Sequence, residues 1–210
     1  MKVLFVHQNF PAQFKHLAPA LIKLGHDVKA LAINNNPTPA GIEVVHYKPL
    51  RANTPKIHPW LLDMESKVIR AEAAFYTALK MRDEGFNPDV IIAHPGWGEA
   101  LFLKDVWPNT RMGLYAEFYY EADKNDIGFD PEFSKPHISE PCRLRLKNAN
   151  HDLQFALADA LISPTQFQAS TLPQALQQKI TVVHDGIDTQ ALQPNANAEL
   201  RLNNSLAIAS

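Results

Sequence analysis

The run Lys-Val-Leu-Phe-Val, from Lys2 to Val6, decides the fold class of this 210-residue chain. It is apolar and rich in β-formers without polar alternation, which is typical of a strand buried on both faces of a parallel sheet. Four apolar residues then recur at helical spacing, Phe14, Leu17, Leu21 and Leu24. Gly25 stands where a left-handed helix cap is expected. The chain therefore begins with one strand and one helix of an α/β sheet.

The alternation of strands and helices continues along the chain. Further strands are predicted at 27–33, 42–47, 87–93, 111–115, 159–163 and 180–183. Helices are predicted at 60–84, near 99–106, around 146–156 and after Pro164. Their apolar positions include Val68, Phe75 and Leu79 in the first of these helices and Leu146, Leu153 and Ala156 in the third.

This order predicts an α/β fold with a Rossmann-like, doubly wound and mainly parallel sheet that carries helices on both faces. Residues 1–188 are expected to form this domain. The tail at 189–210 has no periodic pattern and is expected to be an interdomain linker or the truncated start of a second domain.

Composition disfavours several classes of partner. The formal net charge is -2, which leaves no electrostatic footprint for nucleic acid. No apolar run reaches the roughly 18 residues of a transmembrane helix, although contact with a membrane surface stays open. The single cysteine, Cys142, cannot form an internal disulfide, and the N-terminus lacks the pattern of a signal peptide. We therefore expect a cytoplasmic protein.

Polar residues follow five of the predicted strands. Ligands of open parallel sheets bind beyond the carboxyl ends of the strands, so these residues are expected to share one rim. One stretch, Ser163 to Thr165, is assigned no role. The candidate substrate-binding residues are His7, Gln8, Asn9, Gly96, Trp97, Gly98, Glu99, Glu117, Tyr119, Tyr120, Asp185 and Gly186.

The stretch His94 to Glu99 is the most informative part of this rim. Its two glycines permit close approach of a ligand, and the Trp97 indole suits a sugar ring. The amides of Gly98 and Glu99 begin a helix and suit an anion. The competing interpretation is structural: His94 and Glu99 cap the next helix, and Trp97 packs between loops.

Structural alternatives also stand for the other rim residues. His7, Gln8 and Asn9 are equally suited to capping the first helix. Tyr119 and Tyr120 are of a type that commonly packs against a neighbouring helix.

Common cofactor and metal motifs are absent from the sequence. The first loop lacks G-x-G-x-x-G, and no P-loop, zinc-ligand spacing, D-x-D pair or G-x-S-x-G elbow is present. Dinucleotide enzymes, metalloenzymes and serine hydrolases are therefore disfavoured, and neither a cofactor nor a metal is expected.

Four stretches, taken in order, resemble family 4 glycosyltransferases. They are Met1 to Val6, Leu17 to Val28, Pro88 to His94 and Val182 to Asp188. The Gly-Trp-Gly-Glu loop and the Glu-Phe-Tyr-Tyr segment look like a bacterial subgroup of that family. The resemblance covers nearly the whole chain.

The resemblance implies the N-terminal half of a GT-B enzyme, in which two Rossmann-like domains face each other across a cleft. This half would bind the acceptor, and a C-terminal domain, missing here, would bind the nucleotide-sugar donor. His94 matches the family's histidine near the reacting sugar and is the candidate catalytic residue, orienting hydroxyls or stabilising charge in an oxocarbenium-like transition state. Phe10-Pro11-Ala12 replaces the family's glycine pair in the first loop.

The expected function is therefore sugar transfer, of the hexosyltransferase type, from a nucleotide-sugar to an acceptor. This chain alone is expected to be inactive and, with its cleft surface uncovered, able to form a homodimer. Two alternatives stay open: a non-catalytic α/β module that binds a glycan or partner protein, and half of a nucleotide-sugar epimerase.

Overall fold

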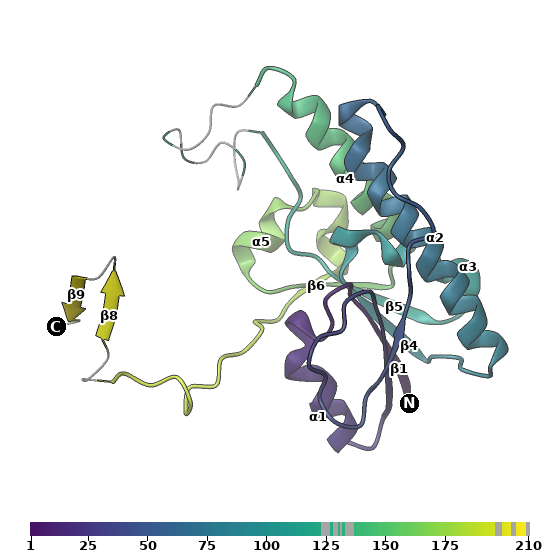
Figure 1. Ribbon diagram of the computed structural model, residues 1–210, viewed down its shortest axis with the longest axis horizontal. Helices are drawn as coiled ribbons and strands as arrows, with labels where there is room; N and C mark the ends of the chain where they lie inside the picture. The colour runs from purple at the N-terminus through teal and green to yellow at the C-terminus, as the bar shows by residue number, and fades with distance from the viewer. Residues whose placement is uncertain are drawn as a thin grey trace.

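The computed structural model describes residues 1–122, 127, 130, 132, 137–195, 199–202 and 205–208, the last two ranges by their backbone. Seven strands form one all-parallel sheet in the order β3-β2-β1-β4-β5-β6-β7 (Figure 1). They are β1 (Lys2–Val6), β2 (Asp27–Ala32), β3 (Glu43–His46), β4 (Val90–Ala93), β5 (Arg111–Tyr115), β6 (Ala160–Ser163) and β7 (Ile180–Val182). The predicted doubly wound α/β sheet is confirmed.

Helices cover both faces of this sheet. On one face lies α1 (Leu17–Lys23), and on the other lie α2 (Leu62–Asp83), α3 (Leu103–Val106) and α4 (Glu140–Leu157) (Figure 1). The helix α5 (Gln166–Thr171) packs beside β6 and β7. Short 3-10 helices join these elements: η1 (Ala12–Lys15), η2 (Pro59–Leu61), η3 (Pro95–Trp97), η4 (Glu99–Phe102) and η5 (Gln174–Lys179).

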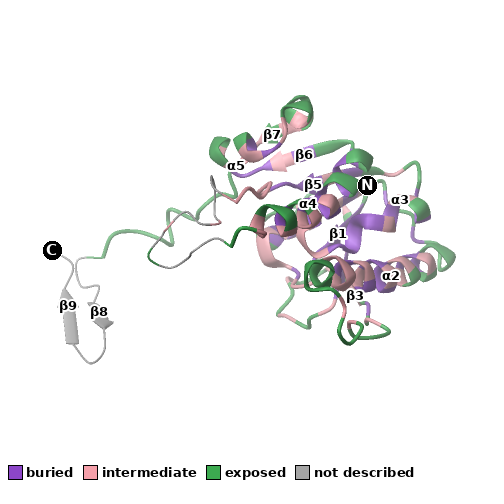
Figure 2. Cartoon of the chain, turned by 90° about the horizontal axis from the view of Figure 1, so that it is seen from above, coloured by how far each residue is buried: buried purple, intermediate pink, exposed green. Residues whose placement is uncertain are grey.

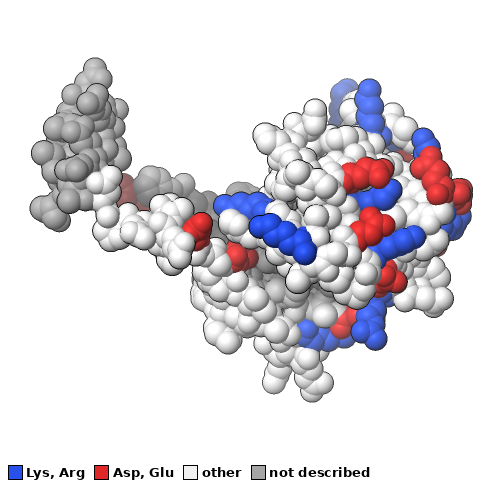
Figure 3. Space-filling view, turned by 90° about the horizontal axis from the view of Figure 1, so that it is seen from below, with Lys and Arg blue, Asp and Glu red and all other residues white. Residues whose placement is uncertain are grey.

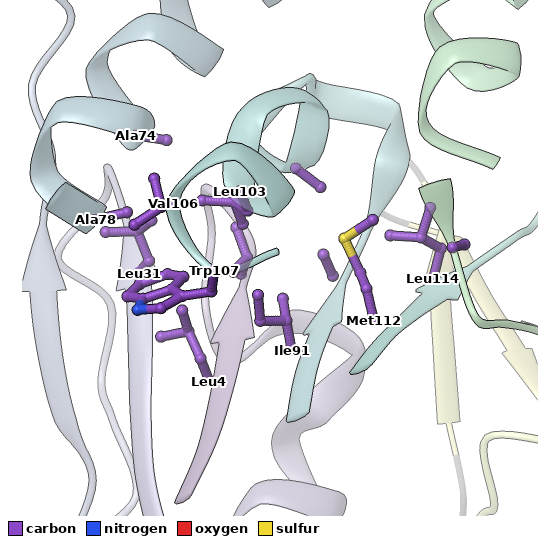
Figure 4. Packing of buried hydrophobic residues seen from close by; sticks show 14 of the residues in the cluster. Leu4, Leu31, Ala74, Ala78, Ile91, Leu103, Val106, Trp107, Met112 and Leu114 are labelled. Carbon is purple, nitrogen blue, oxygen red and sulfur yellow. The ribbon is translucent and has the colours of Figure 1, made fainter. Parts of the chain in front are cut away.

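The strands bury alternate side chains on opposite faces, as the pleat requires. From β1, Leu4 joins the cluster beneath α2 and α3, whereas Phe5 joins Phe14 beneath α1. Trp107 lies against Leu4 and Leu31 in the larger cluster (Figure 4). Each such side chain contributes roughly 1.5–3 kcal/mol when fully buried, so the continuous apolar run of β1 is explained by burial on both faces.

The predicted cap at Gly25 is confirmed, and Gly85 ends α2 in the same backbone region. Gly25 and Gly85 have φ angles of +80° and +91°, in the left-handed region. The Gly25 N–H donates to the Ile22 carbonyl, and the His26 N–H donates to the Leu21 carbonyl. This pair of bonds is the Schellman arrangement, which satisfies carbonyls that the end of α1 leaves free.

The predicted apolar faces of the long helices are partly wrong. In α2, Phe75 and Leu79 are half-buried and pack against the larger cluster, as predicted, and Val68 is half-buried. The buried face of this helix (Figure 2) also includes the small residues Ala74 and Ala78, which the apolar spacing did not select. In α4, Leu153 and Ala156 point to solvent and polar residues point inward. Alanines allow α2 to lie close to its neighbours, a packing effect that apolar periodicity does not report.

The tail contributes a separate small sheet. Two short strands, β8 (Glu199–Leu202) and β9 (Ser205–Ile208), pair antiparallel in a sheet of their own. They do not extend the seven-stranded sheet.

Surface charge and helix hydrophobicity are the two properties that bear on the partners of this chain. On the face seen in Figure 3, acidic and basic side chains are interspersed. Among the residues that the structure describes, no helix has the length and apolar character needed to cross a membrane.

Candidate active site

A cavity of about 720 Å³ opens at the carboxyl ends of β1, β4, β5 and β7. Predicted rim residues from all four strand ends line it: His7, Asn9, His94, Trp97, Glu117, Asp185 and Gly186. A parallel sheet presents all its carboxyl ends at one edge, so His7 and Asp185, which are 178 positions apart in the sequence, meet there. Within the described part of the chain, no three His, Cys, Asp or Glu side chains are grouped to hold a metal ion.

His94, the first residue after β4, makes a hydrogen bond through each ring nitrogen. Its Nδ1 accepts the Gly96 N–H at 3.1 Å, and its Nε2 lies 3.1 Å from Glu117 Oε2. Because a backbone N–H only donates, Nδ1 is the acceptor and Nε2 carries the proton that faces Glu117. The backbone thus selects one tautomer of His94.

Glu117 follows β5 by two residues, and its carboxylate lies beside the His94 ring in the cavity wall. Its Oε1 accepts a hydrogen bond from Gln13 Nε2 at 3.3 Å. The hydrogen bond from His94 is the largest cause that lowers the pKa of Glu117, so this group is a carboxylate at neutral pH. The pair can therefore stabilise positive charge, on the imidazole or on a bound sugar.

His7, the first residue after β1, lies 3% exposed beside this pair. Its Nδ1 accepts the Asn9 N–H at 2.9 Å, and its ring centroid is 5.4 Å from that of His94. Burial, reinforced by the charge of His94 and opposed by Glu117, lowers the pKa of His7 to about 4. His7 is therefore neutral at neutral pH.

The lowered pKa of His7 predicts loss of stability in acid. Between pH 6.5 and pH 4 the unfolded chain binds a proton at this residue that the folded chain does not, so stability falls as pH falls. We expect His7 to account for a loss of about 3 kcal/mol across this window. Urea unfolding at pH 7 and pH 4 measures it, and His7→Gln should reduce the difference whereas His46→Gln, at an exposed position, should not. Equal losses in the wild type and in His7→Gln would contradict the prediction.

His184, two residues after β7, repeats the same local geometry. Its Nδ1 accepts the Gly186 N–H at 3.1 Å. Asp185 beside it accepts a hydrogen bond from the Tyr115 hydroxyl. Burial, followed by the hydrogen bond to Asp185, raises the pKa of Tyr115, so this hydroxyl remains a donor at neutral pH. Three strand ends thus present imidazoles whose tautomers are set by the residue two positions later.

Four of the predicted site residues, which follow β1 and β4, do not line the cavity. The Gln8 carbonyl accepts the N–H groups of Ile33 and Asn34, which ties the loop to the end of β2. Gly96 donates its N–H to His94. Gly98 and Glu99 are buried, and Glu99 accepts a hydrogen bond from Tyr47, so their position favours a structural role over anion binding.

The two tyrosines after β5 point toward α4. The Tyr119 hydroxyl donates to Asp152, and the Tyr120 ring stacks on His151 with ring centroids 5.7 Å apart. Both line a separate cavity of about 580 Å³. This geometry favours the packing alternative for Tyr119 and Tyr120.

Four polar residues that line the 720 Å³ cavity are not among the residues predicted from sequence. His184 directly precedes the predicted Asp185, whereas Gln13, Lys15 and His16 lie in the turn after β1. Their spacing marks them as ordinary outward positions of an amphipathic segment. Proximity to the end of β1 is the one signal that points to them.

A family model for the glycosyl transferase family 4 group matches residues 24–192. The chain belongs to this family. The match includes His94, Glu117 and Asp185 and begins after His7. No curated protein matches the chain significantly.

Solved structures share the fold of this family 4 domain at low sequence identity. The catalytic domain of starch synthase IV from Arabidopsis thaliana, bound to ADP and acarbose, has a TM-score of 0.57 at 14% identity, over 90% of this chain and 52% of that one. A UDP-glucosyltransferase from Polygonum tinctorium capable of glucosylating indoxyl, in complex with 3,4-dichloroaniline, has a TM-score of 0.53 at 10% identity, and the match covers 94% of this chain and 54% of that one. UDP-GlcNAc 2-epimerase from Methanocaldococcus jannaschii has a TM-score of 0.50 at 16% identity, and the match covers 87% of this chain and 45% of that one. The chain thus spans about half the length of the structures it matches.

Proposed function

We propose that this chain is the acceptor-side half of a glycosyltransferase that moves a sugar, of the hexose type, from a nucleotide-sugar to an acceptor. The observation that carries the proposal is the His94–Glu117 pair, 3.1 Å apart, beside Trp97 in the main cavity of a family 4 domain. The acceptor hydroxyl would be bound in this cavity.

The side chains of the cavity suit the parts of such a reaction. The face of Trp97 offers an apolar surface to a sugar ring, and Asn9 and Gln13 offer amides to its hydroxyls. Departure of the nucleotide leaves positive charge on the sugar, which the Glu117 carboxylate with His94 stabilises electrostatically. Asp185 and Gly186 would complete the acceptor wall. The proposal requires no metal or cofactor.

We further propose that residues 1–188 are one domain, that 189–210 begin the link to a donor-binding domain, and that the protein is cytoplasmic. Two observations support a covering domain: the half-length match to the solved structures, and the exposed apolar side chains of Val183 and Ile187 near the cavity. The same surface favours a homodimer of the isolated chain, which light scattering measures.

The proposed cytoplasmic location is supported by Cys142, whose free thiol suits a reducing compartment.

The test compares this 210-residue chain with the complete polypeptide encoded by its gene. Each is incubated with a panel of UDP-, ADP- and GDP-sugars, and release of the nucleotide is measured. We expect turnover by the complete polypeptide and none by the 210 residues, because the donor-binding domain is required to bind the nucleotide-sugar. Transfer by the 210 residues alone, or no nucleotide-sugar binding by the complete polypeptide, would overturn the proposal; the second result would favour a binding module.

Half of a nucleotide-sugar epimerase is the second candidate, because an epimerase shares the fold at a TM-score of 0.50. The products separate the two functions. An epimerase converts its nucleotide-sugar into an isomer without an acceptor, whereas the proposed transferase releases the nucleotide and forms a glycoside.

A further inference from the structure

The helix α4 buries polar side chains and exposes two leucines. Asn148, Asn150 and Gln154 are 5%, 0% and 0% exposed, whereas Leu153 and Leu157 are 54% and 44% exposed. Leu144 and Phe155 are buried on the same side of the helix, so hydrophobic burial explains part of this orientation but not the three buried amides. A buried amide costs free energy unless its hydrogen bonds are made, so the partners of these three amides, here called the amide row, indicate what they do.

Two members of the amide row bind one carbonyl beside the candidate active site. Asn150 Nδ2 and Gln154 Nε2 donate to the Pro95 carbonyl at 3.0 and 2.9 Å. Gln154 Nε2 also donates to Asn150 Oδ1 at 3.0 Å, which holds the two amides together. Both lone pairs of the Pro95 oxygen are thereby occupied, so the direction of this carbonyl is fixed.

The Pro95 carbonyl and the Gly96 N–H belong to the same peptide unit. Because that unit is planar, fixing the carbonyl on one side fixes the N–H on the other. This N–H donates to His94 Nδ1 and so decides that His94 Nε2 carries the proton facing Glu117. A continuous set of hydrogen bonds therefore runs from α4 through one peptide to the His94 ring.

The third member of the amide row holds the segment that carries Glu117. Asn148 Oδ1 accepts the Tyr120 N–H at 3.0 Å, and its Nδ2 donates to the Tyr120 carbonyl at 2.8 Å. Tyr120 follows Glu117 by three residues. In the segment after β4, Arg70 Nε of α2 also donates to the Trp97 carbonyl at 2.8 Å. The helix α4 thus binds the backbone near both members of the His94–Glu117 pair, at Pro95 and at Tyr120.

We propose that Asn150 and Gln154 are positioning residues, which set the tautomer and orientation of His94 through the Pro95–Gly96 peptide, and that Asn148 sets Glu117 opposite it. The catalytic meaning of this arrangement rests on the proposed function. The arrangement itself is measurable without substrate, so a failed transfer assay and a failed positioning role are distinguishable.

The test measures the ring ¹⁵N chemical shifts of His94 at neutral pH in Asn150→Leu/Gln154→Met. These replacements keep similar side-chain size and remove the N–H donors. We expect the preference for the Nε2–H tautomer to fall about tenfold, which corresponds to about 1.4 kcal/mol, the contribution of one hydrogen bond. His94→Gln identifies the signals, because those of His94 disappear from its spectrum.

Two controls separate positioning from general destabilisation. His7, whose Nδ1 is held by Asn9, has no bond to the amide row and should keep its tautomer. Phe155→Leu changes a buried residue of the same helix that is part of the apolar cluster, and it should leave the His94 signals unchanged. An unchanged His94 tautomer in the folded double variant, or an equal change in Phe155→Leu, would overturn the proposal. If the double variant fails to fold, Gln154→Met alone is measured. A smaller fall in the Nε2–H preference of His94 is then expected. An unchanged preference in that variant would overturn the proposal.

Discussion

Replacing Gly98 with alanine is expected to destabilise this domain by roughly 2–4 kcal/mol, the sum of a left-handed backbone penalty and overpacking. Gly98 has a φ of +99°, and a Cβ there would lie 2.7 Å from the Lys67 Cβ and 2.7 Å from the Lys67 carbonyl oxygen. Both atoms belong to Lys67 in the second turn of α2, and neither is the far end of a flexible side chain, so relief of the clash requires a shift of the helix backbone. Urea unfolding followed by circular dichroism measures the loss.

Gly85→Ala is the matched control for this prediction. Gly85 has a φ of +91°, and a Cβ there would meet nothing within 4 Å. It therefore carries the backbone penalty without the clash, and about 1 kcal/mol is expected. Equal losses at the two positions would show that the approach of the His94–Gly98 loop to α2 is not as close as described.

Replacing His94 with alanine in the complete polypeptide is expected to lower kcat about 10²- to 10⁴-fold, the usual range for a charge-stabilising or proton-transferring side chain. The imidazole lies at 3.1 Å from the Glu117 carboxylate, so its loss leaves that carboxylate without its main partner. Steady-state kinetics with the nucleotide-sugar identified in the turnover assay measures the effect. His46→Ala, at the exposed end of β3, should leave kcat within about twofold, because surface changes have small effects.

Glu117→Gln separates two roles of Glu117, the hydrogen bond that orients His94 and the negative charge that stabilises the sugar. An amide oxygen still accepts the hydrogen bond of His94 Nε2, but the negative charge is removed. If the carboxylate stabilises positive charge on the sugar, we expect kcat to fall about 100-fold, as for loss of one electrostatic contact in a buried site. A loss under about threefold would assign Glu117 to orientation of His94 alone.

The sequence predicted where the site lies better than it predicted which residues line it. His7, His94, Glu117 and Asp185 each follow a strand directly or within three residues, and a rule about parallel sheets is enough to bring them to one edge. Gly98, Glu99, Tyr119 and Tyr120 come four to six residues after their strands, in the same loops, and yet face α2, Tyr47 or α4. The rule selects strand ends, whereas the direction of each side chain depends on the path of its loop.

The inward face of α4 illustrates the same division. Apolar spacing predicted that Leu153 and Ala156 would be buried, but the buried residues include Asn150, His151 and Gln154. Periodicity counts only the hydrophobic contribution to burial, whereas these amides are buried because the Pro95 carbonyl needs donors. That requirement is visible only once the loop after β4 is placed against the helix.

The sequence by itself determined the order of strands and helices in the main sheet, its doubly wound and mainly parallel character, and the family to which the chain belongs. These follow from local properties, namely apolar runs, turn residues and glycine caps, which act within a few residues along the chain. Only the tertiary structure decided which rim residues share the cavity, which tautomer His94 holds and which face of α4 is buried. The cavity lining and the buried face of α4 depend on contacts between distant residues, such as the His94–Glu117 and Gln154–Pro95 hydrogen bonds, which span 23 and 59 positions and which no local pattern encodes. The His94 tautomer depends on the path of the backbone from His94 to Gly96, which becomes visible once that loop is placed.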